Sequence, residues 1–452
     1  MTQDPMYPDG GDDTRPQAGA RRVTTSRASR GRRGAAPAAA GGGGGRGGRG
    51  GRRKAPQPGK VVFRVITASL LTLGLFTGVG VSLVYNNLDG NITRVSAGNQ
   101  VKNRPAKEVV EGPKEPLNIL VMGTDTRAGK GNGIDGEAGG GLSDTTILFH
   151  VSADRKFAYG ISIPRDTAVM RPTCYRKDGS AIAGSGGFVK WNDAYAIGGP
   201  FCTQQQFEQL TGVRVDKYLV VDFNQFKDMV NALDGVEVCI PEDINDTKRN
   251  IFLKAGTREI KGNEALTYVR LRYRVGSGTD TDRTRRQQAF IGSMINKALT
   301  AGMISRPDRM VRFLSAATSS LQTDFDGLSS IADVAFTARG IGPENIKFVT
   351  TPWVYSDKVS GGIEWTPEVN KLWRLVRKDR PLTPEFLSQA ISAGDAPDGS
   401  STASASPSPS PSQSPSVSPS PSGSPSPGTS PTPTPAPGGL DAKGRENVGL
   451  CS

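Results

Sequence analysis

The stretch EALTYVRLRYRVGSGTDTDRTRRQQ, residues 264–288, is the most arginine-rich part of the chain outside its N-terminal arm. It contains Arg270, Arg272, Arg274, Arg283, Arg285 and Arg286. An arginine-rich stretch most often forms a solvent-exposed basic face, so a functional interpretation needs evidence that some of these side chains are buried. The apolar residues that follow the stretch supply that evidence.

A helix is predicted from about Asp282 onwards, because apolar residues recur there at helical spacing. The recurring residues are Phe290, Ile291, Met294, Ile295 and Ala298. With about 100° of rotation per residue, Arg283 and Gln287 fall on this apolar face. Arg286 falls beside the face, whereas Arg285 points the opposite way. Because arginine is rarely buried without a partner, arginines at the edge of a core-facing stripe predict a buried anion.

The residues before this helix alternate between arginine and apolar side chains. Arg270 and Arg272 alternate with Val269, Leu271 and Tyr273. The alternation favours a strand or extended segment, on which both guanidinium groups would point to one side. Converging planar guanidinium groups offer many donors and need many acceptor oxygens, so they suit a phosphate or pyrophosphate better than a carboxylate.

The net charge of +13 over 452 residues is concentrated at the N-terminus. Residues 1–64 contain 14 Lys or Arg and 4 Asp, so ten of the thirteen charges lie there and the body is nearly neutral. A neutral body argues against a general nucleic-acid-binding protein, and no nucleic acid partner is expected. The single histidine, His150, excludes multi-histidine metal sites and is interpreted as a core or strand-edge residue.

Residues 1–60 are rich in Gly, Arg, Ala and Pro and are predicted to be a disordered basic arm. Such a tract can bind RNA, but its position offers another explanation, because an uncharged run, Val65–Val84, follows it. Twenty helical residues span about 30 Å, the thickness of the bilayer's hydrocarbon core. A transmembrane helix at 61–85 is therefore predicted, with the basic arm in the cytoplasm and all later residues outside. This topology is that of a single-pass type II protein of the cytoplasmic membrane.

The remaining chain divides into a polar stalk at 86–115, a folded domain at 116–393 and a disordered Ser/Pro-rich tail at 394–452. Within the domain, short apolar runs typical of strands alternate with helical patterns. The strands are predicted at 117–123, 142–152, 157–163, 215–223, 236–240 and 346–352, and helices at 203–210 and 223–233. This alternation predicts an α/β (α+β) fold with a central mixed sheet flanked by helices.

The cysteines are predicted to lie outside the cytoplasm, in an oxidising environment where a disulfide is stable. A Cys174–Cys202 disulfide is favoured, since both residues flank the irregular stretch between a predicted hairpin and a helix. Cys239 lies inside an apolar strand and is interpreted as a buried small hydrophobe. Cys451 lies at the end of the tail.

Three short segments place charges at the ends of predicted strands: GTDTR (123–127), SDTT (143–146) and SIPRD (162–166). Asp125 and Asp144 border neighbouring apolar runs, so both could reach one hard cation. Magnesium is typically held by one or two carboxylates together with phosphate oxygens. With the arginines, these segments predict a two-carboxylate, many-arginine site for a diphosphate.

These segments resemble motifs of the LytR-CpsA-Psr family of Gram-positive cell walls. Further matching motifs are WNDAYAIGGP, LTGV, DGVEV, ALTYVRLR and DTDRTRRQQ, and all of them occur in the same order as in the family, over about residues 117–290. The resemblance implies an enzyme that moves a glycopolymer from a polyprenyl-pyrophosphate carrier to peptidoglycan, forming a phosphodiester. It also implies a deep apolar pocket for the prenyl chain. The basic arm and Pro-Ser tail resemble those of actinobacterial members. At 234–236, DGV replaces the commoner GGV. The identity of the transferred polymer is left open: teichoic-acid-like, teichuronic or arabinogalactan-like.

The resemblance also implies roles for individual residues. Asp125 and Asp144 match magnesium-associated aspartates, with Mn²⁺ as an alternative ion. The pyrophosphate-binding positions are Arg127, Arg165, Arg270, Arg272, Arg283, Arg286 and Gln287. The catalytic positions are Arg165, Arg283, Arg286 and Asp166, of which Asp166 is the candidate proton acceptor. Asp280 lies in a matching motif without an assigned role.

Two other functions compete with glycopolymer transfer. A polyprenyl-pyrophosphate pyrophosphatase would use the same site, because water and a sugar hydroxyl are both nucleophiles. A non-catalytic envelope regulator or binding protein is the third hypothesis. The predicted anchor argues against a DNA-binding regulator, because it places the arginine site across the membrane from DNA. The partners expected for the transferase are the lipid-linked donor, peptidoglycan and membrane lipid.

Overall fold

The computed structural model describes residues 58–124, 143–248, 250–272, 275–276, 278–304, 306–319, 321–400 and 439–451. The predicted positions Asp125 and Arg127, and Arg274 of the arginine-rich stretch, lie outside these residues. So do most of the predicted basic arm and most of the predicted tail.

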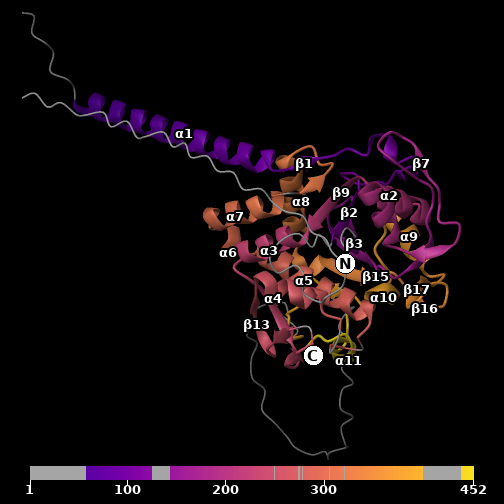
Figure 1. The fold of residues 1–452 in the computed structure, drawn as a ribbon. Helices are drawn as coiled ribbons and strands as arrows, with labels where there is room; N and C mark the ends of the chain where they lie inside the picture. The colour runs from indigo at the N-terminus through magenta and orange to yellow at the C-terminus, as the bar shows by residue number, and fades with distance from the viewer. Residues whose placement is uncertain are drawn as a thin grey trace, which may run out of the picture. The chain divides into compact units, whose positions relative to one another are not determined.

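An eight-stranded sheet forms the centre of the domain, in the order β1-β14-β9-β2-β3-β4-β15-β18 (Figure 1). Its strands are β1 Thr93–Arg94, β2 Leu117–Thr124, β3 Ser143–Val151, β4 Ala158–Ile163, β9 Lys217–Asp222, β14 Gln322–Thr323, β15 Ile346–Thr350 and β18 Ile391–Ser392. The β2–β3 and β3–β4 pairs are antiparallel, whereas β2–β9 and β4–β15 are parallel. The predicted α/β fold with a mixed central sheet is confirmed.

Five two-stranded sheets and the helices complete the described fold. The small sheets pair β5 Ala168–Met170 with β8 Phe188–Lys190, β6 Cys174–Tyr175 with β7 Ala181–Ile182, β10 Val236–Ile240 with β13 Gly256–Ile260, β11 Ile244–Asp246 with β12 Ile251–Leu253, and β16 Trp353–Ser356 with β17 Gly362–Trp365. The α-helices are α1 Pro58–Gly90, α2 Asp193–Thr211, α3 Phe223–Ala232, α4 Gly262–Arg270, α5 Asp280–Leu299, α6 Ala301–Ile304, α7 Pro307–Thr318, α8 Leu328–Ile341, α9 Val369–Arg377, α10 Pro384–Leu387 and α11 Ala442–Asn447.

The two faces of the sheet have different surroundings, because side chains alternate along each strand. On one face, Leu120 of β2 and Leu148 of β3 are fully buried in a core that includes Phe207 of α2 and Trp373 of α9. On the other face, the alternate residues, such as Val121 of β2, line a cavity beneath the helices. The sheet therefore gives one face to the core and one to the candidate site.

The buried histidine is part of this framework. His150 Nδ1 lies 2.8 Å from Asn118 Oδ1, and its Nε2 lies 2.9 Å from Asp379 Oδ1. Both ring nitrogens are thus occupied by side chains that join β2, β3 and the residues after α9. This structural role agrees with the interpretation of His150 as a core residue.

The prediction of an extended segment over residues 269–273 is wrong for Val269 and Arg270, because helix α4 continues through Arg270. Ala265, Leu266 and Tyr268 of α4 are buried, so the stretch carries a helical apolar face that the alternation around Val269 concealed. The chain leaves the helix at Leu271, whose ψ of 129° is extended. Arg270 and Arg272 therefore reach the site from a helix end and the turn after it.

Part of the segment predicted as a polar stalk, residues 92–104, packs on the domain. β1 pairs in parallel with β14. The backbone N–H of Lys102 donates to Gln205 Oε1 at 2.7 Å, and Arg104 Nε donates to Glu208 Oε2 at 2.8 Å. Gln205 and Glu208 are buried in α2, so this contact extends the folded unit to the residues that follow α1.

Helix α1 is long and apolar enough to cross a membrane. Within it, the large apolar residues from Val61 to Tyr85 are exposed rather than packed against the protein. A buried core helix would show the opposite pattern. This helix is therefore the membrane anchor of the chain.

Two disulfides are present in the described chain, Cys174–Cys202 and Cys239–Cys451. The interpretation of Cys239 as an unpaired buried residue is wrong. The expectation of a coreless tail is also wrong for residues 439–451, which form α11 and bury Leu450 and Arg445. The sequence concealed both features, because the partner cysteine is 212 residues away.

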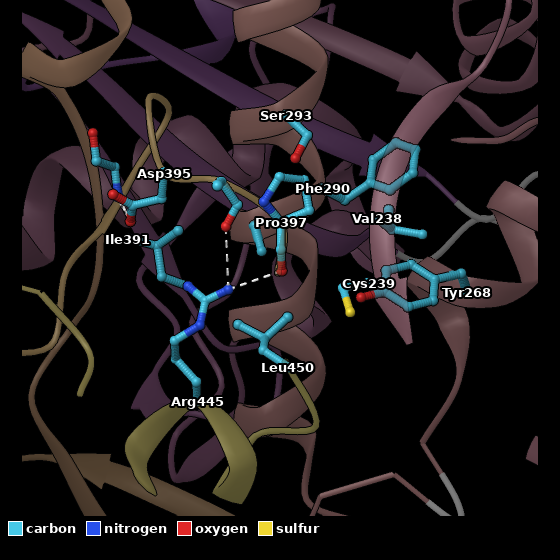
Figure 2. A pocket seen from close by; sticks show the side chains of 13 residues that line it. Val238, Cys239, Tyr268, Phe290, Ser293, Ile391, Asp395, Pro397, Arg445 and Leu450 are labelled. Atoms are coloured by element: carbon cyan, nitrogen blue, oxygen red, sulfur yellow. Dashed lines mark hydrogen bonds between the residues drawn. The ribbon is translucent and has the colours of Figure 1, made fainter. Parts of the chain in front are cut away.

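Several contacts hold this C-terminal segment against the domain. Arg445 Nη2 donates to the carbonyl oxygens of Pro397 at 3.0 Å and Ala396 at 3.5 Å (Figure 2). Gly276 permits the close approach of the segment, because a Cβ there would lie 2.8 Å from the carbonyl oxygen of Asn447. Figure 2 shows Arg445 and Leu450 beside Cys239 and Tyr268, which ties the end of the chain to β10 and α4.

We expect Cys451→Ser to lower the free energy of unfolding by about 2–4 kcal/mol, because the bond closes a long loop and holds Leu450 in place. The measurement is the thermal or denaturant unfolding of the oxidised protein, with wild type treated with dithiothreitol as a second comparison. A Cys451→Ser variant as stable as untreated wild type would contradict a structural role for this bond.

Candidate functional site

A cavity of about 450 Å³ lies between one face of the central sheet and helices α3, α4, α5 and α8. Most of its walls are apolar. They include Ile119, Val121, Ile147, Phe149, Leu219, Val221, Phe226, Met229, Leu266, Phe290, Ile291, Met294, Ile295, Val334, Ala338 and Ile346. Its polar lining groups include Asp144, Thr145, Arg270, Arg283 and Gln287. The cavity thus combines an extended apolar surface with a localised charged region.

Asp280, the first residue of α5, is surrounded by arginines in that charged region. Its Oδ1 lies 2.5 Å from Arg283 Nη2, 3.4 Å from Arg165 Nε and 3.8 Å from Arg272 Nη2. Helix α5 begins here because Thr279 and Asp282 form a reciprocal capping box. The cap fixes the position of Asp280 and Arg283 relative to the sheet.

Arg165 joins this cluster to the ends of the strands. Its guanidinium pairs with Asp144 of β3, and its Nε lies 3.8 Å from Asp166 Oδ2. Lys190 Nζ, from β8, lies 2.7 Å from Asp166 Oδ1. Asp166 is therefore held between two cations at the edge of the cluster.

Arg270 and Gln287 are placed by neighbouring elements of the cavity wall. The Arg270 guanidinium carbon lies 4.5 Å from the centre of the Phe223 ring, which is a cation–π geometry. Gln287 Oε1 accepts from Thr145 Oγ1 at 3.1 Å, and its Nε2 donates to the carbonyl oxygen of Val269 at 3.1 Å. Both predicted ligand residues therefore line the cavity with fixed orientations.

The predicted difference between Arg283 and Arg285 is visible in their contacts. Arg283 is 2% exposed and lines the cavity. Arg285 instead donates to the carbonyl oxygen of Gln389 at 2.6 Å, away from the cluster. Arg286 is fully buried and donates to the backbone carbonyls of Leu271 and Val448, so its contacts support the turn that carries Arg272.

The electrostatic environment separates the two buried carboxylates. Burial alone would raise the pKa of Asp144, but the guanidinium groups of Arg283, Arg165 and Arg270 outweigh burial and lower the pKa below its usual value. For Asp280, burial raises the pKa in spite of Arg283 and Arg165, and the nearby carboxylates add to the shift. The arginines therefore shift the pKa of Asp144 downwards, whereas burial shifts that of Asp280 upwards.

Several buried polar atoms of the cluster have no hydrogen-bond partner within the described part of the chain. They are Arg165 Nε, Arg283 Nε and both carboxylate oxygens of Asp280, although Arg165 Nε and Asp280 Oδ1 take part in the ion pairs given above. Buried polar groups are normally satisfied, so the Nε donor of Arg283, a residue that lines the cavity, is available to an oxygen of a bound anion.

The described residues contain no group of three or more His, Cys, Asp or Glu side chains that could hold a metal ion by themselves. Asp144 contributes one carboxylate next to the arginines, and Asp125 lies outside the described residues. Among the described residues of the site, Asp144 is thus a carboxylate that could contact a hard cation, and such an ion would take most of its oxygen ligands from a phosphate or from water.

The sequence did not assign roles to three residues of the site. Asp280, at the centre of the cluster, was recognised only as part of a motif. Lys190, which contacts Asp166, and Phe223, which stacks on Arg270, follow from tertiary contacts between distant segments. For Asp280, the motif DTDRTRRQQ and the neighbouring threonine, which caps α5, were the local signals.

Comparison with known proteins gives one family. Residues 84–378 match the model of the LytR_cpsA_psr family. The polyisoprenyl-teichoic acid–peptidoglycan teichoic acid transferase TagV of Bacillus subtilis is 31% identical over 56% of this chain and 61% of its own length. The cell wall biosynthesis protein LcpA of Corynebacterium glutamicum is 27% identical over 76% of this chain and 70% of its own length.

The crystal structure of TagV from B. subtilis covers 60% of this chain and 99% of the crystallised chain, at 26% identity and a TM-score of 0.45. The alignment with the full TagV sequence spans less than two thirds of that relative's length. The family match, by contrast, extends from the end of α1 through α9 and includes the strands, the helices and the arginine cluster. The chain belongs to the LytR_cpsA_psr family.

Proposed function

We propose that this protein transfers a glycopolymer from a polyprenyl-pyrophosphate carrier to peptidoglycan, forming a phosphodiester outside the membrane. The observation that supports the proposal most strongly is a cavity with an apolar body and a charged region that includes Arg270 and the buried Arg283, whose Nε has no hydrogen-bond partner among the described residues. A ligand with a long hydrocarbon chain and a pyrophosphate has both complementary parts. The name of TagV, which describes a teichoic acid transfer to peptidoglycan, adds support from a relative.

The reaction requires one phosphorus–oxygen bond to form and another to break. A hydroxyl oxygen of the peptidoglycan sugar attacks the phosphorus that carries the glycopolymer. The bond from that phosphorus to the bridging oxygen breaks, and polyprenyl phosphate leaves with the bond's electron pair. The hydroxyl proton moves to Asp166, which lies at the edge of the cluster.

The arginines provide most of the stabilisation that such a reaction needs. Phosphoryl transfer depends mainly on positioning and on neutralising charge at the transferred and leaving groups. Arg165, Arg272 and Arg283 converge around Asp280, so they can bind both phosphates. Arg270 and Gln287 orient the ligand where the apolar cavity begins.

We also propose that Mg²⁺, or Mn²⁺ in its place, assists the reaction. Asp144, which lines the cavity, and Asp125 are the residues that would hold it. Such an ion, when bound, neutralises charge on the phosphate oxygens. Because two carboxylates hold Mg²⁺ weakly, its occupancy is expected to depend on bound substrate.

The direct test supplies full-length protein in lipid nanodiscs with a labelled lipid-pyrophosphate glycopolymer and peptidoglycan. Label covalently attached to peptidoglycan, with release of polyprenyl phosphate, is the expected result. Release of the polymer as a free phosphate, with none on peptidoglycan, would favour the pyrophosphatase. Absence of both products, with the donor bound, would favour a non-catalytic binding protein.

The proposed topology has its own test. We expect protease added to intact protoplasts to reduce the protein to a small N-terminal remnant, because the charge asymmetry around residues 65–84 predicts that the basic arm lies in the cytoplasm. Digestion in detergent provides the control that the folded domain can be cleaved. A full-length chain that survives on protoplasts but not in detergent would contradict the topology.

A further inference from the structure

The end of the membrane helix is joined to helices α7 and α8. Leu88 and Ile92 are buried in a cluster with Leu314 of α7 and with Leu328 and Ile331 of α8. With a rise of about 1.5 Å per residue, Leu88 lies about 6 Å along the axis beyond Val84, the last residue of the apolar run. The N-terminal end of α8 is thus packed against the chain about one helical turn beyond the end of the apolar run.

Polar contacts strengthen this junction. Asp89 Oδ1 accepts from the backbone N–H of Leu328 at 2.9 Å, at the start of α8. Arg94 Nη2 pairs with the same oxygen at 2.6 Å, and Arg94 Nε donates to the carbonyl oxygen of Asp326 at 3.1 Å. The start of α8 is therefore attached to the chain that leaves the membrane rather than merely adjacent to it.

Helix α8 also forms a wall of the apolar cavity. Val334, Ala335 and Ala338 line the cavity, and the buried residues of the helix are Leu328 and Ile341, near its two ends. Ala335 is exposed as well as cavity-lining, so the cavity reaches the surface along this helix. One helix thus contacts the membrane anchor at its start and the cavity along its middle.

The outer side of α8 carries an exposed aromatic residue. Phe336 is 70% exposed and lies about 160–200° around the helix from Val334 and Ala338, so it points away from the cavity. A single exposed aromatic is common on soluble proteins. Here it lies on the helix held at the anchor, with the exposed Asp333 and Arg339 each one turn away, and aromatic residues are enriched where proteins contact lipid headgroups.

We propose that the outer face of α8, around Phe336, lies on the phospholipid bilayer, and that the prenyl chain enters the cavity beside α8 directly from the membrane. The second part rests on the proposed function. Entry at this point keeps the hydrocarbon chain out of water from the bilayer to the cavity. The pyrophosphate then lies at the arginine cluster, with the chain extending back towards α8.

The membrane contact is tested by replacing Phe336 with the photoreactive residue p-benzoylphenylalanine in the full-length protein in phospholipid nanodiscs. Tyr355 of β16, which is 71% exposed, is the matched control for the same replacement. After irradiation, mass spectrometry measures phospholipid adducts. We expect at least ten times more lipid adduct at position 336 than at 355. Equal yields, no lipid adduct, or adducts at 336 only with protein would overturn the contact.

The route of the prenyl chain is tested with Phe336→Asp, using Tyr355→Asp as control. We expect Phe336→Asp to slow uptake of long-chain polyprenyl pyrophosphate from vesicles at least fivefold, with binding of a short, water-soluble prenyl pyrophosphate unchanged. Unchanged uptake from vesicles, or equal loss for both ligands, would overturn the route. If the lipid adduct forms at 336 but neither prenyl pyrophosphate binds, the membrane contact stands and the proposed function fails.

Discussion

Replacement of Arg283 by alanine is expected to lower the rate of glycopolymer transfer by about 100- to 1,000-fold, the cost typical of removing one preorganised charge-stabilising donor. Arg285→Ala is expected to stay within about threefold of wild type. Both residues lie on α5, two positions apart. Arg283 is buried beside Asp280, whereas Arg285 donates to Gln389 outside the cluster.

The comparison requires that both variants fold. Loss of Arg283 leaves Asp280 near Arg165 and Arg272, so part of its ion pairing persists. Circular dichroism and thermal unfolding measure the fold, and Arg283→Lys, which keeps the charge but loses the planar fork, serves as a second variant. Equal loss of activity in Arg283→Ala and Arg285→Ala, with both proteins folded, would contradict the claim that the cavity-facing side of α5 binds the anion.

Replacement of Asp144 by asparagine is expected to lower turnover by about 100-fold while changing the affinity for polyprenyl pyrophosphate only a few-fold. The arginines and the apolar cavity still hold the ground state, whereas the carboxylate acts on the charge that develops during transfer. Because the pKa of Asp144 is lowered, its carboxylate stays ionised to a lower pH than that of an ordinary aspartate. Its contribution should be lost only as the pH falls through that lowered pKa.

The metal is tested in the same experiment. Turnover and binding are measured separately for wild type, Asp144→Asn and Asp125→Asn, with Mg²⁺ and with EDTA. We expect EDTA to reduce wild-type turnover strongly and to have little further effect on the variants. Wild-type turnover that is unchanged by EDTA would show that the carboxylates orient the arginines without a metal.

The sequence predicted well where one local pattern determined both structure and chemistry. The spacing of Phe290, Met294 and Ala298 determined the phase of α5, and that phase correctly separated Arg283 from Arg285. The central strands followed from short apolar runs, since a strand buried on both faces needs apolar residues in succession. Each of these features depends on residues that lie close together in the sequence.

The prediction was wrong where tertiary contacts outweighed a local pattern. Alternation around Val269 indicated an extended segment, but the buried face of Ala265, Leu266 and Tyr268 is helical. The pairing of Cys239 with Cys451 and the packing of Arg104 on Glu208 join segments more than 100 residues apart. No local periodicity records contacts of that kind.

The central claim is that one ligand occupies both the arginine cluster and the apolar cavity, and competitive binding tests it most directly. The affinity of full-length protein is measured for a prenyl pyrophosphate, for the corresponding prenyl alcohol and for inorganic pyrophosphate, with wild type and Arg283→Ala. We predict that the prenyl pyrophosphate binds at least 100-fold more tightly than either part alone. We also predict that Arg283→Ala weakens its binding but not that of the alcohol. If wild type bound the prenyl alcohol as tightly as the prenyl pyrophosphate, the account would be contradicted.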